Sequence, residues 1–244
     1  MKFSTKILAA ALIVLPVSAL ADYNFIPKLG IGHKSYSLDM GKGFPSNKNV
    51  INASVTGVSW GFTVVSSSKW YFDFEQFGGT GTHEGLTAED GDFVRQDISL
   101  SIGRSFDEGY TAFAGFRHGG SEFQFDNGVT KSAELDNDSV GLFVGGAKSF
   151  VLSSTSNIAL SGAIASLTAE FKSFDTGTAI DATGDTIGYS LGVAWNKRFA
   201  KKWNLSVGGR YQSYTYTDVK DDTTVIGDQS ETITSLYAKM GYIF

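Results

Sequence analysis

Charged side chains recur at alternate positions in several segments of the chain. Asp73 and Glu75 are two positions apart, and so are Arg95 and Asp97. In a β-strand, each of these pairs would therefore lie on one face. Carboxylates beside arginines could act as a general acid and base, form a ring of charge that selects ions, or neutralise one another. The charged residues that we predict on the lumen face of the strands are Asp73, Glu75, Arg95, Asp97, Arg117, Arg210, Glu231 and Lys239.

The neighbours expected for these groups favour a structural role. If Phe77 lies opposite Phe93, Glu75 faces Arg95 across two strands. Paired charges of this kind fill a narrow interior without leaving an unpaired group. We therefore interpret the set as an interior ion-pair cluster, with a selectivity ring or a catalytic carboxylate pair as the alternative.

The three histidines do not stand in a catalytic context. His83 follows an expected strand and precedes Glu84, in a stretch that we predict to be a loop, while His33 and His118 fall on apolar faces. Ser121 is too far from His118 for the His-x-Ser element of lipid A deacylases. The chain also has no zinc-ligand spacing, haem motif or phosphate-binding loop. We expect no catalytic residue, no cofactor and no metal site.

Acidic residues gather between the expected strands. The sequence Asp136-Asn137-Asp138 suggests a hard-cation loop but lacks the spacing of an EF-hand. Solvated loops are the simpler explanation for the whole set, which is Glu84, Glu89, Asp90, Asp92, Asp126, Glu134, Asp136, Asp138, Asp218, Asp221, Asp222 and Asp228. The formal charge of −5 argues against nucleic acid as a partner.

The elements that must position these residues are strands. Alternating segments are separated by clusters of Gly, Asn, Asp and Ser, which are typical of turns. We predict ten strands, at 23–38, 52–65, 69–77, 93–106, 110–125, 139–150, 157–174, 186–200, 203–217 and 236–244. Merging one hairpin would give eight. Connections after the even strands are brief and most of those after the odd strands are longer, which predicts a membrane barrel with short turns at one end and long loops at the other.

Parity assigns the faces of the strands. In 203–217, Trp203, Leu205 and Val207 oppose Asn204 and Ser206. The face rich in Gly and Ser suits a narrow lumen, so we predict apolar side chains outside and polar ones inside. The segment 157–174 changes phase after Ile164, and we expect a β-bulge near residues 165–166.

The two ends of the chain indicate its destination. Residues 1–21 resemble a secretory signal, with Lys2, an apolar stretch and a small-residue cleavage site. Removing its lysines would lower the formal charge to −7. One barrel domain at 22–244 follows, and the absence of Cys means only that it uses no disulfide. The chain ends on alternating residues with Tyr242 and Phe244 on the apolar face.

This ending resembles the closing strand of bacterial outer-membrane β-barrels, in which a terminal Phe with an aromatic residue two positions earlier is read by the barrel-assembly machinery. The resemblance is to the broad group of small barrels that contains the OmpX-like and OmpW-like proteins, and it covers the whole mature chain. It implies a transmembrane antiparallel up-and-down barrel in the bacterial outer membrane, with lipid, lipopolysaccharide and the assembly machinery as partners and an external ligand unknown.

Two functions are compatible with these features. A non-enzymatic surface barrel would have a lumen filled with side chains, and its acidic external loops would bind a partner or support the envelope. A small porin-like channel for ions or small solutes would need an open lumen. Barrels of eight to ten strands are narrow enough to be filled by side chains, which favours the first function.

Overall fold

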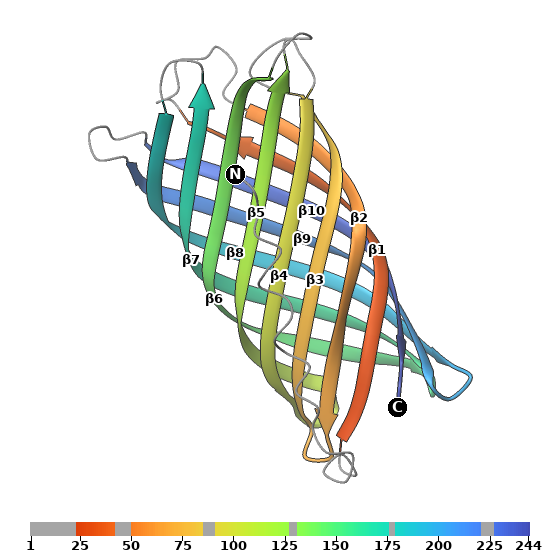
Figure 1. Cartoon of the computed structure of the whole chain (residues 1–244). Helices are drawn as coiled ribbons and strands as arrows, with labels where there is room; N and C mark the ends of the chain where they lie inside the picture. The colour runs from red at the N-terminus through yellow and green to blue at the C-terminus, as the bar shows by residue number, and fades with distance from the viewer. Residues whose placement is uncertain (1–22, 42–49, 85–90, 127–130, 176–178, 221–226) are drawn as a thin grey trace.

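The chain folds into ten long β-strands. The structure, a computed structural model, describes residues 23–41, 50–84, 91–126, 131–175, 179–220 and 227–244. The predicted signal at 1–21 lies outside these residues. The strands are β1 Tyr23–Asp39, β2 Val50–Ser66, β3 Trp70–Glu84, β4 Gly91–Ser105, β5 Tyr110–Asp126, β6 Lys131–Ser153, β7 Ser156–Asp175, β8 Ala179–Phe199, β9 Trp203–Lys220 and β10 Gln229–Tyr242 (Figure 1).

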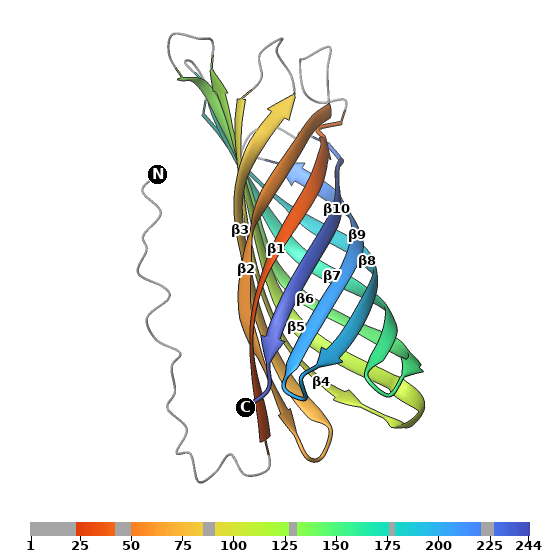
Figure 2. The same ribbon diagram turned by 90° about the vertical axis from the view of Figure 1, so that its right-hand side faces the viewer.

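The strands form one closed antiparallel barrel, as the alternation predicts. Each strand pairs with its neighbours in sequence, and β1 pairs with β10, for example at Leu29 and Met240 (Figure 2). Closure leaves no strand with a free row of backbone donors and acceptors, which is a requirement for a sheet surrounded by lipid. Among the described residues no helix is long and apolar enough to cross a membrane.

The two ends of the barrel differ in their connections. At one end, short hairpins join β2 to β3, β4 to β5, β6 to β7 and β8 to β9, and at the same end β1 begins and β10 ends (Figure 1). Left-handed residues tighten these hairpins, such as Lys69 with φ 67° and Glu108 with φ 59°. We call this the turn end and the opposite end the loop end.

An apolar belt surrounds the half of the barrel nearer the turn end. Its side chains point outward and remain exposed although they are large and hydrophobic, which indicates contact with lipid. Representative members are Leu29, Ile31, Trp60, Ile102, Leu142, Val144, Leu160, Ile164, Leu191, Val193, Val207, Leu236 and Met240. Aromatic rings, among them Trp70, Tyr110 and Trp203, lie at the edge of this belt that is nearest the turn end.

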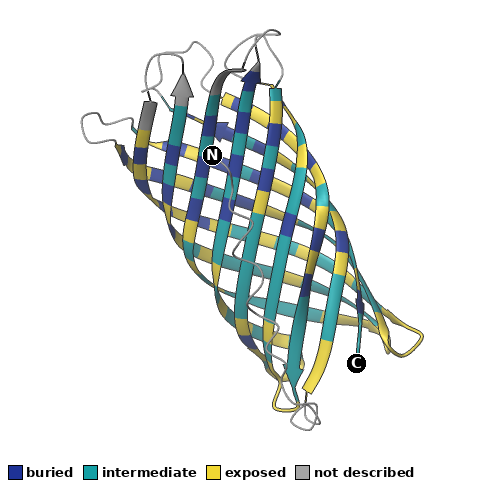
Figure 3. Cartoon of the chain, viewed as in Figure 1, coloured by how far each residue is buried: buried dark blue, intermediate teal, exposed yellow. Residues whose placement is uncertain are grey.

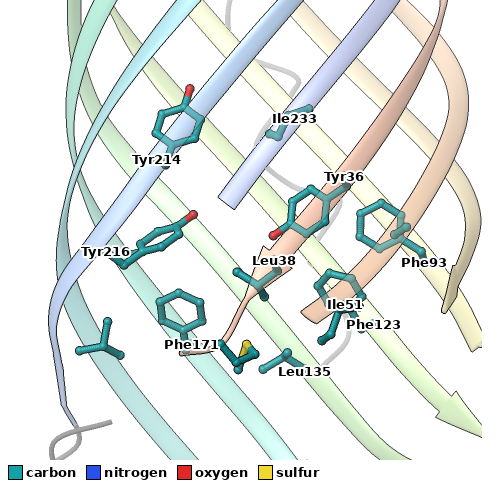
Figure 4. Packing of buried hydrophobic residues seen from close by; sticks show 14 of the residues in the cluster. Tyr36, Leu38, Ile51, Phe93, Phe123, Leu135, Phe171, Tyr214, Tyr216 and Ile233 are labelled. Atoms are coloured by element: carbon teal, nitrogen blue, oxygen red, sulfur yellow. The ribbon is translucent and has the colours of Figure 1, made fainter. Parts of the chain in front are cut away.

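The half nearer the loop end has the opposite polarity. Its lumen is packed with buried hydrophobic side chains, which we call the loop-end core (Figures 3 and 4). The ring centroids of Tyr36 and Phe93 lie 5.3 Å apart, and those of Phe93 and Phe123 lie 4.8 Å apart. The outer wall at this height carries exposed hydroxyls instead, such as Thr82 and Thr234. This half is therefore built like a water-soluble barrel.

The reversal explains why the apolar residues of β7 change parity. In β7, Ile164 faces outward while Leu167 and Phe171 face the lumen, and the pairing of β6 with β7 runs without interruption from Ala133 to Val151. The bulge predicted near residues 165–166 is therefore wrong. Apolar residues change parity there because the strand leaves the lipid and its hydrophobic face turns from the outside to the inside.

The prediction of apolar-out and polar-in is thus confirmed only for the half nearer the turn end. Several stretches predicted as loops are strand instead, because β3 continues to Glu84, β6 begins at Lys131 and β10 begins at Gln229. Of the predicted loop acids, Glu84, Asp92, Asp126, Glu134, Asp136, Asp138 and Asp218 lie in strands. Glu89, Asp90, Asp221 and Asp222 lie outside the described residues, and Asp228 lies just before β10.

Candidate functional site

A network of buried charges lies in the lumen directly beneath the loop-end core. Its centre is Arg95 on β4, whose side chain is 2% exposed. The Arg95 guanidinium lies 2.8 Å from Asp97 Oδ1 and 3.2 Å from Glu231 Oε1, and it donates to Ser121 Oγ at 2.6 Å. A guanidinium with a partner on each side avoids the high cost of an unpaired buried charge.

Asp97 draws together cations from three strands. Besides Arg95 it accepts from Lys34 on β1 and from Arg117 on β5, the last at 3.1 Å. Arg117 also donates to the Tyr214 hydroxyl on β9. Asp97 and Arg117 therefore connect β1, β4, β5 and β9 through the lumen, including strands that are not neighbours in the barrel.

Glu231 connects the charges to the loop-end core. It accepts a hydrogen bond from the hydroxyl of Tyr216, and Asn137 Nδ2 lies 3.3 Å from Glu231 Oε2 and 3.2 Å from the Tyr36 hydroxyl. The rings of these tyrosines lie among the apolar side chains (Figure 4), while the Tyr216 hydroxyl reaches Glu231 and the Tyr36 hydroxyl reaches Asn137. Amphipathic rings thus form the boundary between the dry core and the charged layer.

A second pair of ionic contacts lies closer to the turn end. Lys28 lies 2.5 Å from Asp73, which also accepts from Thr63. Lys239 lies 2.5 Å from Glu75 across the barrel. These side chains are less buried than the Arg95 layer, so water reaches them.

The predicted cluster is therefore assembled, but in a different register. Phe77 pairs with Asp97 rather than with Phe93, and Glu75 pairs with Ser99 rather than with Arg95. The prediction was wrong by four residues along β4. An even shift leaves every side chain on the same face, so the pattern of alternation cannot detect it.

A cavity of about 280 Å³ occupies the lumen between these layers. It runs past Asp73, Asp97 and Arg117, and it is also lined by Arg210. Phe93, Phe123 and the deeper members of the loop-end core do not line it. The cavity thus ends at the ionic layer, and the loop-end core separates it from the loop end.

The histidines do not form a site with the buried carboxylates. His83 is not in a loop but points into the lumen at the loop end, where its Nε2 lies 3.0 Å from the carbonyl oxygen of Gln124. His33 Nδ1 lies 3.0 Å from Thr56 Oγ1 on the outer wall. His118 is 3.9 Å from Asp138, also on the outer wall. Among the described residues, no histidine contacts the Asp97 layer.

Several acids converge on the outer wall above the apolar belt. Carboxylate oxygens of Glu122, Glu134 and Asp136 lie within 4.8 Å of one another. Asp136 stands beyond Val140, which belongs to the belt. Partial burial raises the pKa of Asp136 to about 6, with a further contribution from Glu134 and the other nearby carboxylates. Asn137 points into the lumen, so Asp136-Asn137-Asp138 is not a loop that could surround a cation.

The terminal aromatics lie at the turn end, on the outside. The ring centroids of Tyr242 and Phe244 are 4.8 Å apart, and Tyr242 packs edge-on against Trp203 at 5.0 Å. The backbone N–H of Phe244 donates to the carbonyl oxygen of Phe25 on β1. The last residue therefore contributes to the seam at which the barrel closes.

Some members of the network were missed in the sequence. Lys28 and Lys34 alternate with the lipid-facing Leu29 and Ile31, so parity alone could have placed them in the lumen. Tyr36 and the other core tyrosines gave no comparable indication, because an aromatic residue is equally compatible with either face of a strand.

Comparison with solved structures identifies the fold. The chain is similar to the outer-membrane protease OmpT of Escherichia coli, with a TM-score of 0.58, 8% identity, and coverage of 92% of this chain and 97% of that one. It is also similar to the translocator domain of the autotransporter NalP of Neisseria meningitidis, with a TM-score of 0.53, 10% identity, and coverage of 93% and 91%. The β domain of the Bordetella autotransporter BrkA gives a TM-score of 0.53 at 12% identity, covering 90% and 99%.

At these identities the likeness concerns the fold alone. No family model matches the sequence, and no curated protein matches it either. The closed ten-stranded barrel with a lipid-facing belt nevertheless defines the class of protein. The chain is a β-barrel of the bacterial outer membrane, and in this class short turns face the periplasm and longer loops face the outside.

Proposed function

We propose that this protein is a non-enzymatic surface barrel whose lumen does not conduct. The loop-end core is the observation that carries the proposal. Its side chains, such as Leu38, Phe93, Phe123 and Tyr216, are at most 7% exposed and come from strands on all sides of the lumen. A path for ions would have to displace these side chains and the Arg95 layer beneath them.

The surface that remains for function is the external half of the barrel. Its outer wall is polar and bears acidic side chains such as Glu122, Asp136 and Glu170. Such a wall stands at the height of the lipopolysaccharide and beyond it. We propose that the protein acts through this surface, by contact with lipopolysaccharide or with an external ligand, and so supports the envelope.

The proposal includes assembly by the route of small outer-membrane barrels. The chain resembles the OmpX-like and OmpW-like barrels in its signal-like start, its amphipathic strands and its ending on Tyr242 and Phe244. The position of both rings at the turn end supports a role of this ending in recognition by the barrel-assembly machinery, since the Phe244 ring remains exposed beside the closing seam and Tyr242 packs against it.

The second candidate is a small channel, and the cavity past Asp73 and Arg117 favours it. Planar-bilayer recording of the purified protein distinguishes the two. We expect no defined unitary openings from the wild type, whereas the double variant Phe93→Ala, Phe123→Ala should leak because it removes two rings from the loop-end core. Wild-type openings that disappear in Asp73→Asn or Arg117→Gln would contradict a closed lumen.

The absence of enzymatic activity is tested separately. Purified protein is incubated with lipid A, phospholipid or peptide, and products are followed by mass spectrometry. We expect no turnover, because none of the described histidines lies beside the buried carboxylates. Turnover that is abolished by His83→Ala or Asp97→Asn would show that the barrel is an enzyme.

A further inference from the structure

The charges of the lumen do not balance. Among the residues that the structure describes between the turn end and the loop-end core, six cationic side chains face four carboxylates. The cations are Lys28, Lys34, Arg95, Arg117, Arg210 and Lys239, and the carboxylates are Asp73, Glu75, Asp97 and Glu231. The lumen is thus positive although the whole chain carries a formal charge of −5.

The excess is distributed over both layers. In the upper layer Lys34, Arg95 and Arg117 share Asp97, and Glu231 completes the set. That layer retains one uncompensated positive charge. In the lower layer Lys28 and Lys239 each have a carboxylate of their own, which leaves the second positive charge on Arg210.

Arg210 differs from the other lumen cations in its surroundings. It lines the cavity from β9, its side chain is exposed, and it forms no ion pair with a carboxylate of the described residues. A guanidinium presents planar, paired donors that match the oxygens of a phosphate or a carboxylate. In a narrow, partly enclosed space such a group attracts anions more strongly than it does in open water.

The carboxylate that interacts with Arg210 at longer range is Glu75, which already pairs with Lys239, and the rest of the cavity wall provides hydrogen-bonding groups. Hydroxyls of Ser99, Ser161 and Ser190 and the amide of Gln212 line the same space. A volume of about 280 Å³ is near the lower end of the range for ligand pockets, so it suits a small solute. The loop-end core closes the other side, so a solute would enter and leave from the periplasm.

We propose that the lumen is a periplasm-facing binding site for a small oxyanion that carries phosphate or carboxylate oxygens, with Arg210 as its principal cationic ligand. The bound anion would offset the excess positive charge of the two layers. Arg117, which lines the same cavity, would contribute the second cation. The site is a closed-ended vestibule, so binding needs no passage through the barrel.

The test uses the full mature chain, folded in a detergent that contains no phosphorus. Inorganic phosphate is the probe, and its ³¹P line width is recorded against protein concentration at constant ionic strength. We expect saturable broadening with the wild type. Arg210→Gln should weaken binding at least tenfold, and Arg210→Lys should retain part of it because the charge remains but the paired donors are lost.

The matched control is Arg104→Gln, which removes an arginine from the outer surface at the turn end, where it lies over the rings of Trp70 and Phe106. Its phosphate binding should equal that of the wild type. Circular dichroism verifies that each variant is folded, and Arg210→Lys serves if Arg210→Gln does not fold. Broadening that is absent in the wild type, that is unchanged in Arg210→Lys and Arg210→Gln, or that equal chloride concentrations abolish would overturn the proposal.

Discussion

At the scale of the residue, the lumen shows how burial determines the role of a charged group. Arg95 and Glu231 are each 2% exposed and form an ion pair, whereas Lys69 and Asp107 form a pair on the surface of a turn. The buried pair is constrained by Ser121 and by the tyrosines around it, and removal of one partner leaves a charge with no water to solvate it.

We therefore expect Arg95→Ala to destabilise the barrel by about 3–5 kcal/mol, the usual cost of leaving a buried charge unpaired. Unfolding in urea, followed by tryptophan fluorescence, measures the change. Lys69→Ala is the matched control and should shift the unfolding midpoint far less, because its ion pair with Asp107 is exposed and screened by solvent. Equal effects of the two substitutions would mean that the Arg95 layer is hydrated.

Asp136 predicts a dependence of stability on pH. Its pKa is raised to about 6 in the folded protein by partial burial and by Glu134, Glu122 and Asp138, while Lys172 opposite on β7 pairs with Glu170. The folded state therefore binds a proton more readily than the unfolded state. Ionisation of Asp136 therefore lowers the free energy of unfolding. This loss of stability is absent below the pKa of the unfolded state and appears as the pH rises through about 6.

Asp136→Asn should consequently stabilise the barrel at pH 8, by about 1 kcal/mol after allowance for solvent screening. The advantage over the wild type should shrink as the pH falls toward 4. Thermal unfolding of both proteins across this range provides the measurement. Asp107→Asn is a useful contrast. The hydrogen bond from Lys69 lowers the pKa of Asp107, so the charged form of Asp107 stabilises the folded state and the pH dependence has the opposite sign. A difference that grows toward low pH would contradict the assignment for Asp136.

At the scale of the element, each strand consists of two parts with opposite polarity. β1 passes from the lipid-facing Leu29 and Ile31 to the lumen-facing Tyr36 and Leu38, and the parity of its apolar residues changes between them. A strand that crossed lipid along its whole length would keep one parity. The change therefore marks the height at which the barrel leaves the membrane.

Strand β8 allows this boundary to be tested with one substitution on each side. Val193 belongs to the apolar belt and Thr183 lies on the outer wall nearer the loop end, on the same face. Val193→Arg should cost about 2–4 kcal/mol, as expected for a charge on the lipid face near the midplane. Thr183→Arg should cost less than about 1 kcal/mol, because that position is in water.

The measurement is folding into phospholipid vesicles at increasing urea concentration. A large penalty for Thr183→Arg would show that the lipid reaches the loop-end half. In that case the polar outer wall would contact lipid, and less of the barrel would be available to contact lipopolysaccharide or an external ligand.

At the scale of the whole molecule, closure depends on the meeting of the two ends of the chain. β10 pairs with β1 along twelve positions, and Phe244 adds a backbone hydrogen bond to Phe25. The ring of Phe244 itself is 68% exposed, so it contributes little to packing. Because the ring is exposed, its removal should affect recognition by the assembly machinery more than the stability of the folded barrel.

We expect Phe244→Ala to reduce the amount of barrel in the outer membrane several-fold in cells, while the midpoint of urea unfolding of the purified protein changes little. Fractionation and immunoblotting measure the first quantity. Phe199→Ala, which removes an exposed aromatic residue near the same end, is the control and should assemble normally. Normal assembly of Phe244→Ala would contradict recognition through the terminal residue.

The sequence alone was sufficient to predict the class of fold and the side on which most charges lie. Alternation is a local property, so ten amphipathic segments predict a closed barrel whichever register they adopt. The same parity correctly placed Asp73, Glu75, Arg95, Asp97 and Lys239 in the lumen.

Only the tertiary structure decided which of these groups meet and where the lipid ends. Arg95 pairs with Glu231, which is 136 residues away, and an even slip between β3 and β4 changes the partners without changing any face. The reversal of polarity near Ile164 was present in the sequence, but a change of phase is compatible with a bulge as well as with a change of solvent. The structure distinguishes the two explanations. The pairing of β6 with β7 is uninterrupted, and the apolar residues beyond Ile164 pack inside the lumen, away from the lipid.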